Sequence, residues 1–259
     1  MEQNIKISVI TPTFNDSDFI AETIQSILSQ TYKNFELIIV DDCSTDSTKE
    51  IIKSFSDSRI VFLKNDKNMG AAFSRNLAIS KSTGEYIAFL DGDDVWRPNK
   101  LEHQLNFMVK NNYLFSCTNY GIISEKGDYD NKIITAPKII THKKLLKTSY
   151  IGCLTAMYKK SIFPDLQIPD TIYKRNDYAL WLRLTEKCDC YLFNETTAYY
   201  RKRANSISSG NKGKLIKYHV SMFQKLYGFR KFKAILFSLR NVLYYFVRRI
   251  FFIKNGDAK

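Results

Sequence analysis

Segments with strand character alternate with segments of helical character through the first 110 residues, and this alternation limits the fold more than any other feature. Short runs rich in Ile, Val and Phe are typical of buried strands, and each is followed by apolar residues at helical spacing. The expected strands are residues 5–11, 35–40, 59–63 and 86–90, and the expected helices are residues 20–30, 44–55, 71–81 and 98–108. Strands connected through helices run parallel, with right-handed crossovers. The sequence therefore predicts an α/β sheet of the nucleotide-binding type over residues 1–110.

The fourth expected strand ends in three carboxylates within four residues, Asp91–Asp94. Acids this close repel one another unless a cation lies among them, and hard cations such as Mg²⁺ take carboxylates and substrate phosphates as ligands. Two neighbouring strands also finish in polar residues, Thr11 and Thr13 on the first and Asp41 and Asp42 on the second. Because ligands bind at the carboxyl ends of strands in such sheets, we predict a metal–diphosphate site there. The alternative is an acidic loop after an ordinary strand.

The helix 71–81 opens with small residues, Gly70-Ala71-Ala72, and carries Arg75 little more than one turn later. Small residues allow a close approach of the backbone, and Arg75 could pair with the acids of the metal site or with the diphosphate. The chain lacks both the G-x-G-x-x-G and the G-x-x-x-x-G-K-[ST] patterns, which argues against a dinucleotide fold and a P-loop fold.

Beyond residue 115 the pattern changes to short strands and one helix. We expect strands at 115–123, 132–135, 154–158, 191–193 and 198–201, a turn at Gly127-Asp128, and a helix at 177–186. Asp177 stands where that helix begins, and a carboxylate there could act as a general base, which contributes about 10²–10⁴-fold. The helix dipole favours its ionised form. The alternative is that the polar residues before the helix only start it.

The C-terminal region is strongly basic. Residues 201–259 carry 15 Lys and Arg against one acid, whereas the rest of the chain carries 24 basic and 25 acidic residues. In residues 231–254, Lys233, Arg240, Asn241 and Arg248 fall on one helix face and apolar residues cover the rest. No uncharged run approaches the roughly 20 residues that span a bilayer. The pattern predicts an interfacial helix on an anionic membrane surface, with a core-packing helix as the alternative. Nucleic acid is not an expected partner, because the basic residues lie on a very apolar segment.

The five cysteines show no spacing typical of a metal or redox site, and the N-terminus has no signal peptide pattern. We therefore expect a cytoplasmic protein with free thiols.

Several motifs in a fixed order resemble family 2 glycosyltransferases of the GT-A fold. They are Val9–Asn15, Val40–Asp46, Asn68 with Gly70–Ala72 and Arg75-Asn76, Phe89–Asp94, Ile151–Thr155, Asn176–Leu182, and Tyr200-Arg201 with Ser206–Ser208. The chain is most similar to the small bacterial transferases of the teichuronic-acid and O-antigen type. The resemblance covers residues 5–210.

The resemblance implies an inverting transfer from a nucleotide sugar, usually a UDP-sugar, with Mg²⁺ or Mn²⁺. On the donor side, the resemblance assigns Thr11, Thr13 and Phe14 to the wall that holds the nucleobase, and Asp42 (less readily Asp41) to a contact with uracil. It assigns Arg75 and Gly92 to positions beside the diphosphate, and Asp91 to ribose or the metal. Asp93 would be the main metal ligand, and Asp177 would be the catalytic base. Trp181 and Asn176 would lie on the acceptor side. Many members have Glu-Asp where this chain has Asn176-Asp177. Because Asn176 cannot accept a proton as a general base, Asp177 is the only candidate for that role in this motif.

The predicted architecture is thus a Rossmann-like mixed sheet flanked by helices. Residues 1–210 form the GT-A domain, with a nucleotide-binding half (1–110) and an acceptor half (111–210), and residues 211–259 form a basic helical tail. The expected enzyme adds a sugar to a hydroxyl of a growing, lipid-linked cell-surface polysaccharide, on the inner face of the cytoplasmic membrane. A sugar-phosphate nucleotidyltransferase is one alternative, but the loop Thr13–Ser17 lacks the glycine it would need. A non-catalytic sugar-nucleotide-binding protein is the other.

Overall fold

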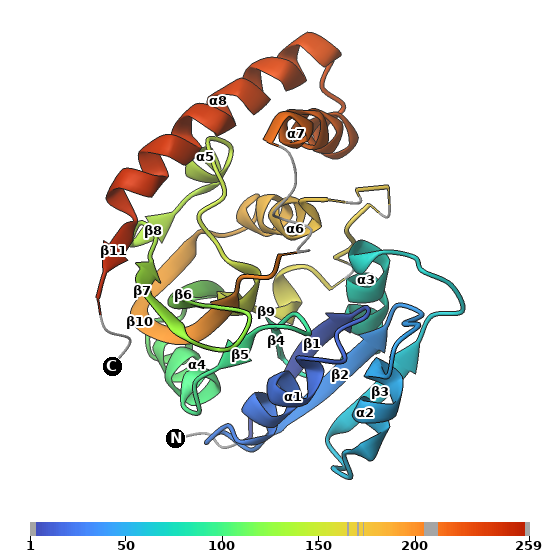
Figure 1. Cartoon of the computed structure of the whole chain (residues 1–259). Coiled ribbons are helices and arrows are strands. Elements are labelled where there is room, and N and C mark those ends of the chain that lie inside the picture. Colours follow the sequence, from blue (N-terminus) through green and yellow to red (C-terminus); the bar gives the residue numbers. More distant parts are fainter. Residues whose placement is uncertain (1–3, 165, 170, 173, 205–211, 257–259) are drawn as a thin grey trace.

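The nucleotide-binding half is built around four parallel strands. In the computed structural model, which describes residues 4–164, 166–169, 171–172, 174–204 and 212–256, β1 (Ile7–Thr13) lies between β2 (Phe35–Asp41) and β4 (Tyr86–Phe89). The strand β3 (Ile60–Lys64) pairs with β2 at the edge (Figure 1). Every residue of β1, β2 and β4 is buried, as expected for parallel strands covered on both faces.

Helices cover both faces of this sheet. The helices are α1 (Ile20–Leu28), α2 (Thr48–Ser54), α3 (Ala71–Lys81) and α4 (Lys100–Lys110). One core cluster contains residues of α1, α2 and α4, and a second contains residues of α3. The pleat of β1 divides its side chains between the two, since Val9 belongs to the first cluster and Ile10 to the second. All four predicted helices and all four predicted strands of this half are present, with bounds that differ by a few residues.

The acceptor half extends the same sheet with antiparallel and parallel strands. Its elements are β6 (Phe115–Ile123), β7 (Tyr129–Ile134), β8 (Ile139–Ile140), α5 (His142–Leu145), β9 (Met157–Lys159), α6 (Asn176–Thr185) and β10 (Cys190–Arg201), with short 3-10 helices at Cys153–Thr155 and Lys160–Ile162. The two-residue strand β5 (Val95–Trp96) precedes α4 in the nucleotide-binding half and pairs with β10. The sheet order is β11-β7-β6-β9-β4-β1-β2-β3, and β10 pairs with β5, β6 and β8. The mixed sheet predicted from the sequence is confirmed.

Three of the predicted strands differ from the structure in type or in continuity. The segment 154–158 was expected to be one strand, but its first residues form the 3-10 helix and only Met157 begins β9. The segments 191–193 and 198–201 belong to one strand, β10, whose pairing with β6 shifts register around Thr196. An irregular stretch between two apolar runs reads as a loop in the sequence, although the backbone continues through it as a strand.

The basic tail is packed into the domain. It forms α7 (Lys212–Tyr227), α8 (Lys231–Phe251) and β11 (Ile253–Asn255). Met222 and Phe223 of α7 are fully buried in the same cluster as α3 and α6, and β11 pairs with β7 at the edge of the sheet (Figure 1). The expected helical tail is therefore present, but it completes the acceptor half instead of standing apart. In the part of the chain that the structure describes, no helix is long and apolar enough to cross a membrane.

All five cysteines are free, which confirms the predicted free thiols. The serines of the motif Ser206–Ser208 lie outside the described residues.

Candidate active site

Three arginines from distant parts of the chain hold the carboxylates that follow β4. Arg75 of α3 donates to Asp91 Oδ1. Arg203 Nη1 lies 2.9 Å from Asp93 Oδ2, and the backbone N–H of Arg201 donates to Asp94 Oδ1 over 2.9 Å. The chain thus concentrates three acids at one strand end and surrounds them with fixed positive charge.

Asp93 is only partly compensated by its arginine. Burial, and then the nearby Asp16 and Asp91 carboxylates, raise the pKa of Asp93 from 3.8 to about 6, while Arg203 opposes that rise. Asp16 Oδ1 is 2.5 Å from the same Arg203 nitrogen, so one guanidinium is shared between two acids. A residual negative charge remains here, as a site for a cation requires.

Gly92 allows the first loop of the sheet to approach this cluster. A Cβ at Gly92 would lie 2.7 Å from both Asp16 Oδ2 and Thr13 Oγ1. Thr13 Oγ1 donates to Asp16 Oδ2 over 2.8 Å, which fixes the acid that raises the pKa of Asp93. Glycine is therefore needed for close approach of two loops.

Asp94 has a structural position. It is buried, and burial together with Asp93 and Asp91 raises its pKa well above 3.8, although the Arg201 N–H opposes this. The Arg201 side chain, only 2% exposed, donates from Nε to the Asp93 carbonyl and from Nη2 to Glu22 Oε2. Asp94 thus ties the β4 loop to β10.

Arg75 joins the two halves of the domain at the site. Its Nη1 donates to Asn176 Oδ1 in the first turn of α6, while its Nη2 bonds Asp91. Burial lowers the pKa of the Arg75 guanidinium, but Asp91 and Asp177 nearby raise it to a net value above that of an ordinary arginine. Asp177 is half-buried. Its charge acts on Arg75, which bonds Asp91 of the β4 cluster. Asp91 of the β4 cluster and Asp177 therefore both act on one arginine, although Asp93 and Asp177 are 84 residues apart in the sequence.

The end of β2 is organised differently. Asp42 Oδ1 accepts from Asn65 Nδ2 at 2.7 Å and Met69 N at 2.8 Å, and Asp42 Oδ2 accepts from Gly70 N at 2.7 Å. Gly70 has a φ of +86°, which favours glycine at this helix start. The Asp42 carboxylate therefore shapes the loop that leads into α3.

The residues expected to hold the nucleobase of the donor are mostly buried. Thr11 is fully buried and Thr13 is 3% exposed, whereas Phe14 is 41% exposed. Among the described residues, neither Thr11 Oγ1 nor Asp41 Oδ2 has a hydrogen-bond partner. Two buried polar atoms on adjacent strands thus have unused hydrogen-bonding capacity, and Phe14 offers an accessible ring for stacking.

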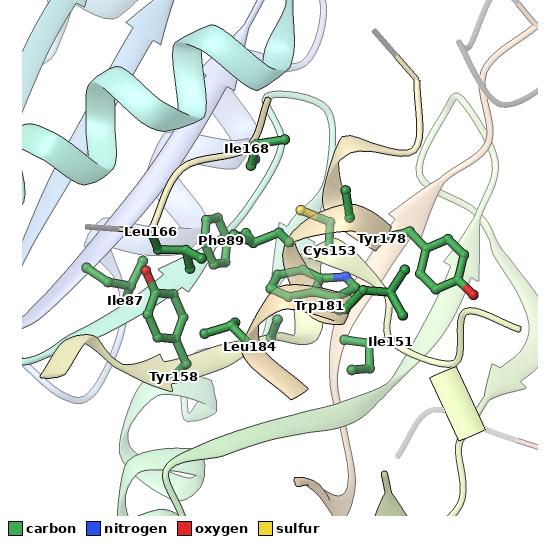
Figure 2. Packing of buried hydrophobic residues seen from close by; sticks show 14 of the residues in the cluster. Ile87, Phe89, Ile151, Cys153, Tyr158, Leu166, Ile168, Tyr178, Trp181 and Leu184 are labelled. Carbon is green, nitrogen blue, oxygen red and sulfur yellow. The ribbon is translucent and has the colours of Figure 1, made fainter. Parts of the chain in front are cut away.

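Trp181 does not line a pocket in this structure. It is fully buried and packs against Phe89, with ring centroids 5.3 Å apart, and against Phe115 at 5.6 Å (Figure 2). The prediction that Trp181 lies on the acceptor side is therefore corrected. The spacing of Trp181 in α6 places it on the face that packs on the sheet. Asn176 is also buried, at 6% exposed, and its Oδ1 accepts a hydrogen bond from Arg75.

The residues present fit a divalent cation with few protein ligands. Nowhere in the described ranges do three or more His, Cys, Asp or Glu side chains gather in a way that could hold a metal ion. Mg²⁺ and similar ions are bound through one or two carboxylates plus substrate phosphates. Asp93, whose pKa is raised by burial and by the neighbouring carboxylates, and Asp91, 34% exposed at its side chain, supply that smaller donor set.

The sequence predicted Asp16 as a helix N-cap and gave no role at the site to Asp16, Arg201, Arg203 or Cys153. Cys153 Sγ lies 3.9 Å from Asp91 Oδ1, and Arg203 stacks over Phe19 at 4.9 Å. Cys153 and Arg201 stand in two of the motifs that carry the family resemblance, so their positions could have been noted. Nothing local in the sequence indicates Arg203, which is 110 residues from Asp93.

The chain is similar to known proteins over most of its length. The description "Glycosyl transferase family 2" belongs to the family profile that matches residues 8–167. The chain is 44% identical over 214 residues to the putative teichuronic acid biosynthesis glycosyltransferase TuaG of Bacillus subtilis (strain 168), covering 82% of this chain and 84% of that protein. It is 41% identical over 216 residues, 82% of each chain, to the UDP-Glc:alpha-D-GlcNAc-diphosphoundecaprenol beta-1,3-glucosyltransferase WfgD of Escherichia coli.

A solved structure shows the same fold. The mannosyltransferase PcManGT from Pyrobaculum calidifontis, in complex with GDP-Man and Mn²⁺, superposes with a TM-score of 0.67 over 90% of this chain and 68% of that chain, at 17% identity. An identity this low supports the fold alone. The predicted GT-A type architecture is confirmed.

Proposed function

The chain belongs to glycosyl transferase family 2, and from this premise we propose that it is an inverting transferase that moves a sugar from a UDP-sugar to a hydroxyl of a lipid-linked polysaccharide precursor. The observation that supports the proposal is that Asp91 and Asp177 both act electrostatically on Arg75, with Asp93 close to Asp91. A donor-side charge cluster and a candidate catalytic base would thus share one arginine.

On the donor side, Asp93 and Asp91 would hold Mg²⁺ or Mn²⁺. The bound ion would supply Lewis-acid neutralisation of the charge that develops on the departing diphosphate. Arg75 and Gly92 border this region, and Arg75 keeps its positive charge because the carboxylates around it raise its pKa. Phe14 would stack on the uracil ring, with Thr11, Thr13 and the Asp41-Asp42 strand end closing the base site.

On the acceptor side, Asp177 would remove the proton from the attacking hydroxyl. It stands in the first turn of α6, where the helix dipole favours a negative charge. Attack from the face opposite the leaving diphosphate inverts the anomeric carbon. Asn176 positions α6 through its bond to Arg75, so it acts on the base indirectly.

The class of acceptor follows from the relatives. The printed name of WfgD specifies UDP-Glc as donor and a GlcNAc attached to diphosphoundecaprenol as acceptor, and TuaG is named for teichuronic acid synthesis. We infer the same general chemistry for this chain, namely UDP-sugar transfer to a sugar on a lipid diphosphate. Such a substrate lies in a membrane, which suits a protein in the cytoplasm that associates with the inner membrane face.

The decisive experiment measures UDP release by the purified full chain from a panel of UDP-sugars. A sugar–diphosphate–lipid analogue with a short chain serves as acceptor, with and without Mn²⁺. We expect Asp177→Asn to lower turnover about 10²–10⁴-fold while UDP binding persists. Full turnover by Asp177→Asn would remove Asp177 as the base. Release of pyrophosphate from UTP and a sugar 1-phosphate, without UDP release from any UDP-sugar, would identify a nucleotidyltransferase. Binding of a UDP-sugar without turnover would identify a non-catalytic protein.

A further inference from the structure

One face of α8 is apolar and exposed along its whole length. We call Phe232, Leu236, Leu239, Leu243, Phe246 and Ile250 the apolar stripe. These residues recur at intervals of four and three, which places them on one side of the helix. Each is between 49% and 75% exposed. Single exposed apolar residues are common, but a continuous row of this kind marks an interaction surface.

The opposite face of α8 docks on the acceptor half. Ala234, Ser238 and Asn241 are buried. Asn241 Nδ2 donates to Tyr178 Oη over 2.8 Å. Figure 1 shows the helix running along the side of the domain formed by α5, α6 and α7.

Two arginines add to this docking. Arg240 Nη2 donates to the Leu146 carbonyl over 3.1 Å, and Arg248 Nη1 donates to the Ser149 carbonyl over 2.6 Å. Arg240, Asn241 and Arg248 were predicted to share one helix face, and all three contact the body of the protein. The helix is therefore held with its polar face inward and its apolar stripe outward. A helix on a globular protein normally has the reverse orientation.

The charge of this region indicates what covers the stripe. Residues 212–256 contain 11 Lys and Arg and no acid. Arg230, Lys231 and Lys233 are exposed at the start of α8, where the first turn carries no acidic residue. Positive charge is unfavourable at a helix N-terminus unless an anion lies nearby. A second copy of this chain would bring two such basic surfaces together, whereas an anionic surface would neutralise them.

We propose that the apolar stripe of α8 inserts into the headgroup–acyl boundary of an anionic phospholipid bilayer, with α8 lying in the plane of the membrane. The inference deepens the proposed function, because it rests on an acceptor held in a membrane. Asn241 bonds Tyr178, the residue after the candidate base Asp177. Insertion of α8 therefore fixes the orientation of the candidate active site relative to the bilayer.

Flotation of the full chain with vesicles tests the proposal. Vesicles of phosphatidylglycerol and phosphatidylcholine are compared with vesicles of phosphatidylcholine alone. We expect tight binding to the anionic vesicles and at least tenfold weaker binding by Leu243→Glu/Ile250→Glu. The matched control is Val109→Glu/Leu114→Glu, which adds the same charge at exposed apolar positions on the body, 40% and 41% exposed, and should bind as the parent protein does. Thermal unfolding verifies that both variants are folded.

Unchanged vesicle binding by a folded Leu243→Glu/Ile250→Glu variant would overturn the proposal. So would a dimer in solution that this variant converts to a monomer without any loss of vesicle binding, since the stripe would then be an interface between copies. Vesicle binding needs no donor or acceptor. Failure of this proposal is therefore distinguishable from failure of the proposed transferase activity, which UDP release reports separately.

Discussion

The ends of β2 and β4 both present acids at the same edge of the sheet, yet the two are built on opposite principles. At the β2 end, three donors from one nearby loop satisfy the Asp42 carboxylate. At the β4 end, Asp93 shares one arginine with Asp16 and keeps a pKa raised to about 6. An acid satisfied by local donors shapes a loop, whereas an acid left short of compensation is prepared for a charged ligand.

Asp93→Asn should produce the largest functional change of any substitution at either strand end. We expect turnover with Mn²⁺ to fall about 10²–10³-fold, because Lewis-acid stabilisation contributes several kcal/mol to the transition state. The free energy of unfolding should not fall, because the variant removes a charge that burial and like-charged neighbours disfavour. UDP release and urea unfolding measure the two effects. A large loss of stability would mean that Asp93 is structural, as Asp42 is.

Asp42→Asn should show the complementary behaviour. An amide nitrogen would face at least one of the N–H donors of Asn65, Met69 or Gly70, and a buried donor would lose its acceptor. We expect the free energy of unfolding to fall by about 2–3 kcal/mol, measured by urea unfolding, while kcat of the folded fraction at saturating donor stays within about tenfold of the parent. An undiminished stability together with lost activity would erase the contrast between the strand ends.

Cation binding at the β4 end should depend on pH. The pKa of Asp93 is raised on folding from 3.8 to about 6, so the folded state retains a proton that the unfolded chain loses between about pH 4 and pH 6. This group therefore makes the folded state less stable as pH rises through that window. Below pH 6, a cation must displace the proton, and Mn²⁺ affinity should fall about tenfold per pH unit.

Calorimetric titration of Mn²⁺ with UDP present, between pH 5 and pH 7.5, measures this slope. Asp93→Asn should bind weakly and show no such slope over the same range. A slope that persists in Asp93→Asn would assign the titration to another group.

How far the sequence predicts the molecule depends on the range of the contacts involved. The bounds predicted for Ala71–Lys81 and Phe115–Ile123 are those observed, because apolar periodicity and flanking breakers are local signals. The strand ends that gather the acids were predicted for the same reason. The partners of those acids were not, since Arg203 reaches Asp93 across 110 residues and no local pattern carries that information.

The tail shows the same limit in another form. Helical spacing predicted a helix over 231–254 and its division into a polar and an apolar face, and α8 spans Lys231–Phe251. Which face packs on the body is decided by the carbonyls of Leu146 and Ser149 and by the Tyr178 hydroxyl. These acceptors belong to residues more than 60 positions away, so periodicity alone could not decide which face packs on the body. Trp181 was misplaced for a related reason, because its burial depends on Phe89 and Phe115.

Arg203→Gln should sharpen the comparison with the smallest effect. The Arg203 guanidinium lowers the pKa of Asp93 against the larger influence of burial and of Asp16 and Asp91, so its removal should raise the midpoint of Mn²⁺ binding by about one pH unit. Lys202→Gln is the matched control, because the adjacent Lys202 bonds the distant Asp130 and its loss changes the net charge equally. The control midpoint should stay within about 0.2 unit of the parent, since exposed pairs contribute little. Equal shifts in both variants would mean that net charge, and not the contact between Arg203 and Asp93, sets the ionisation of the β4 cluster.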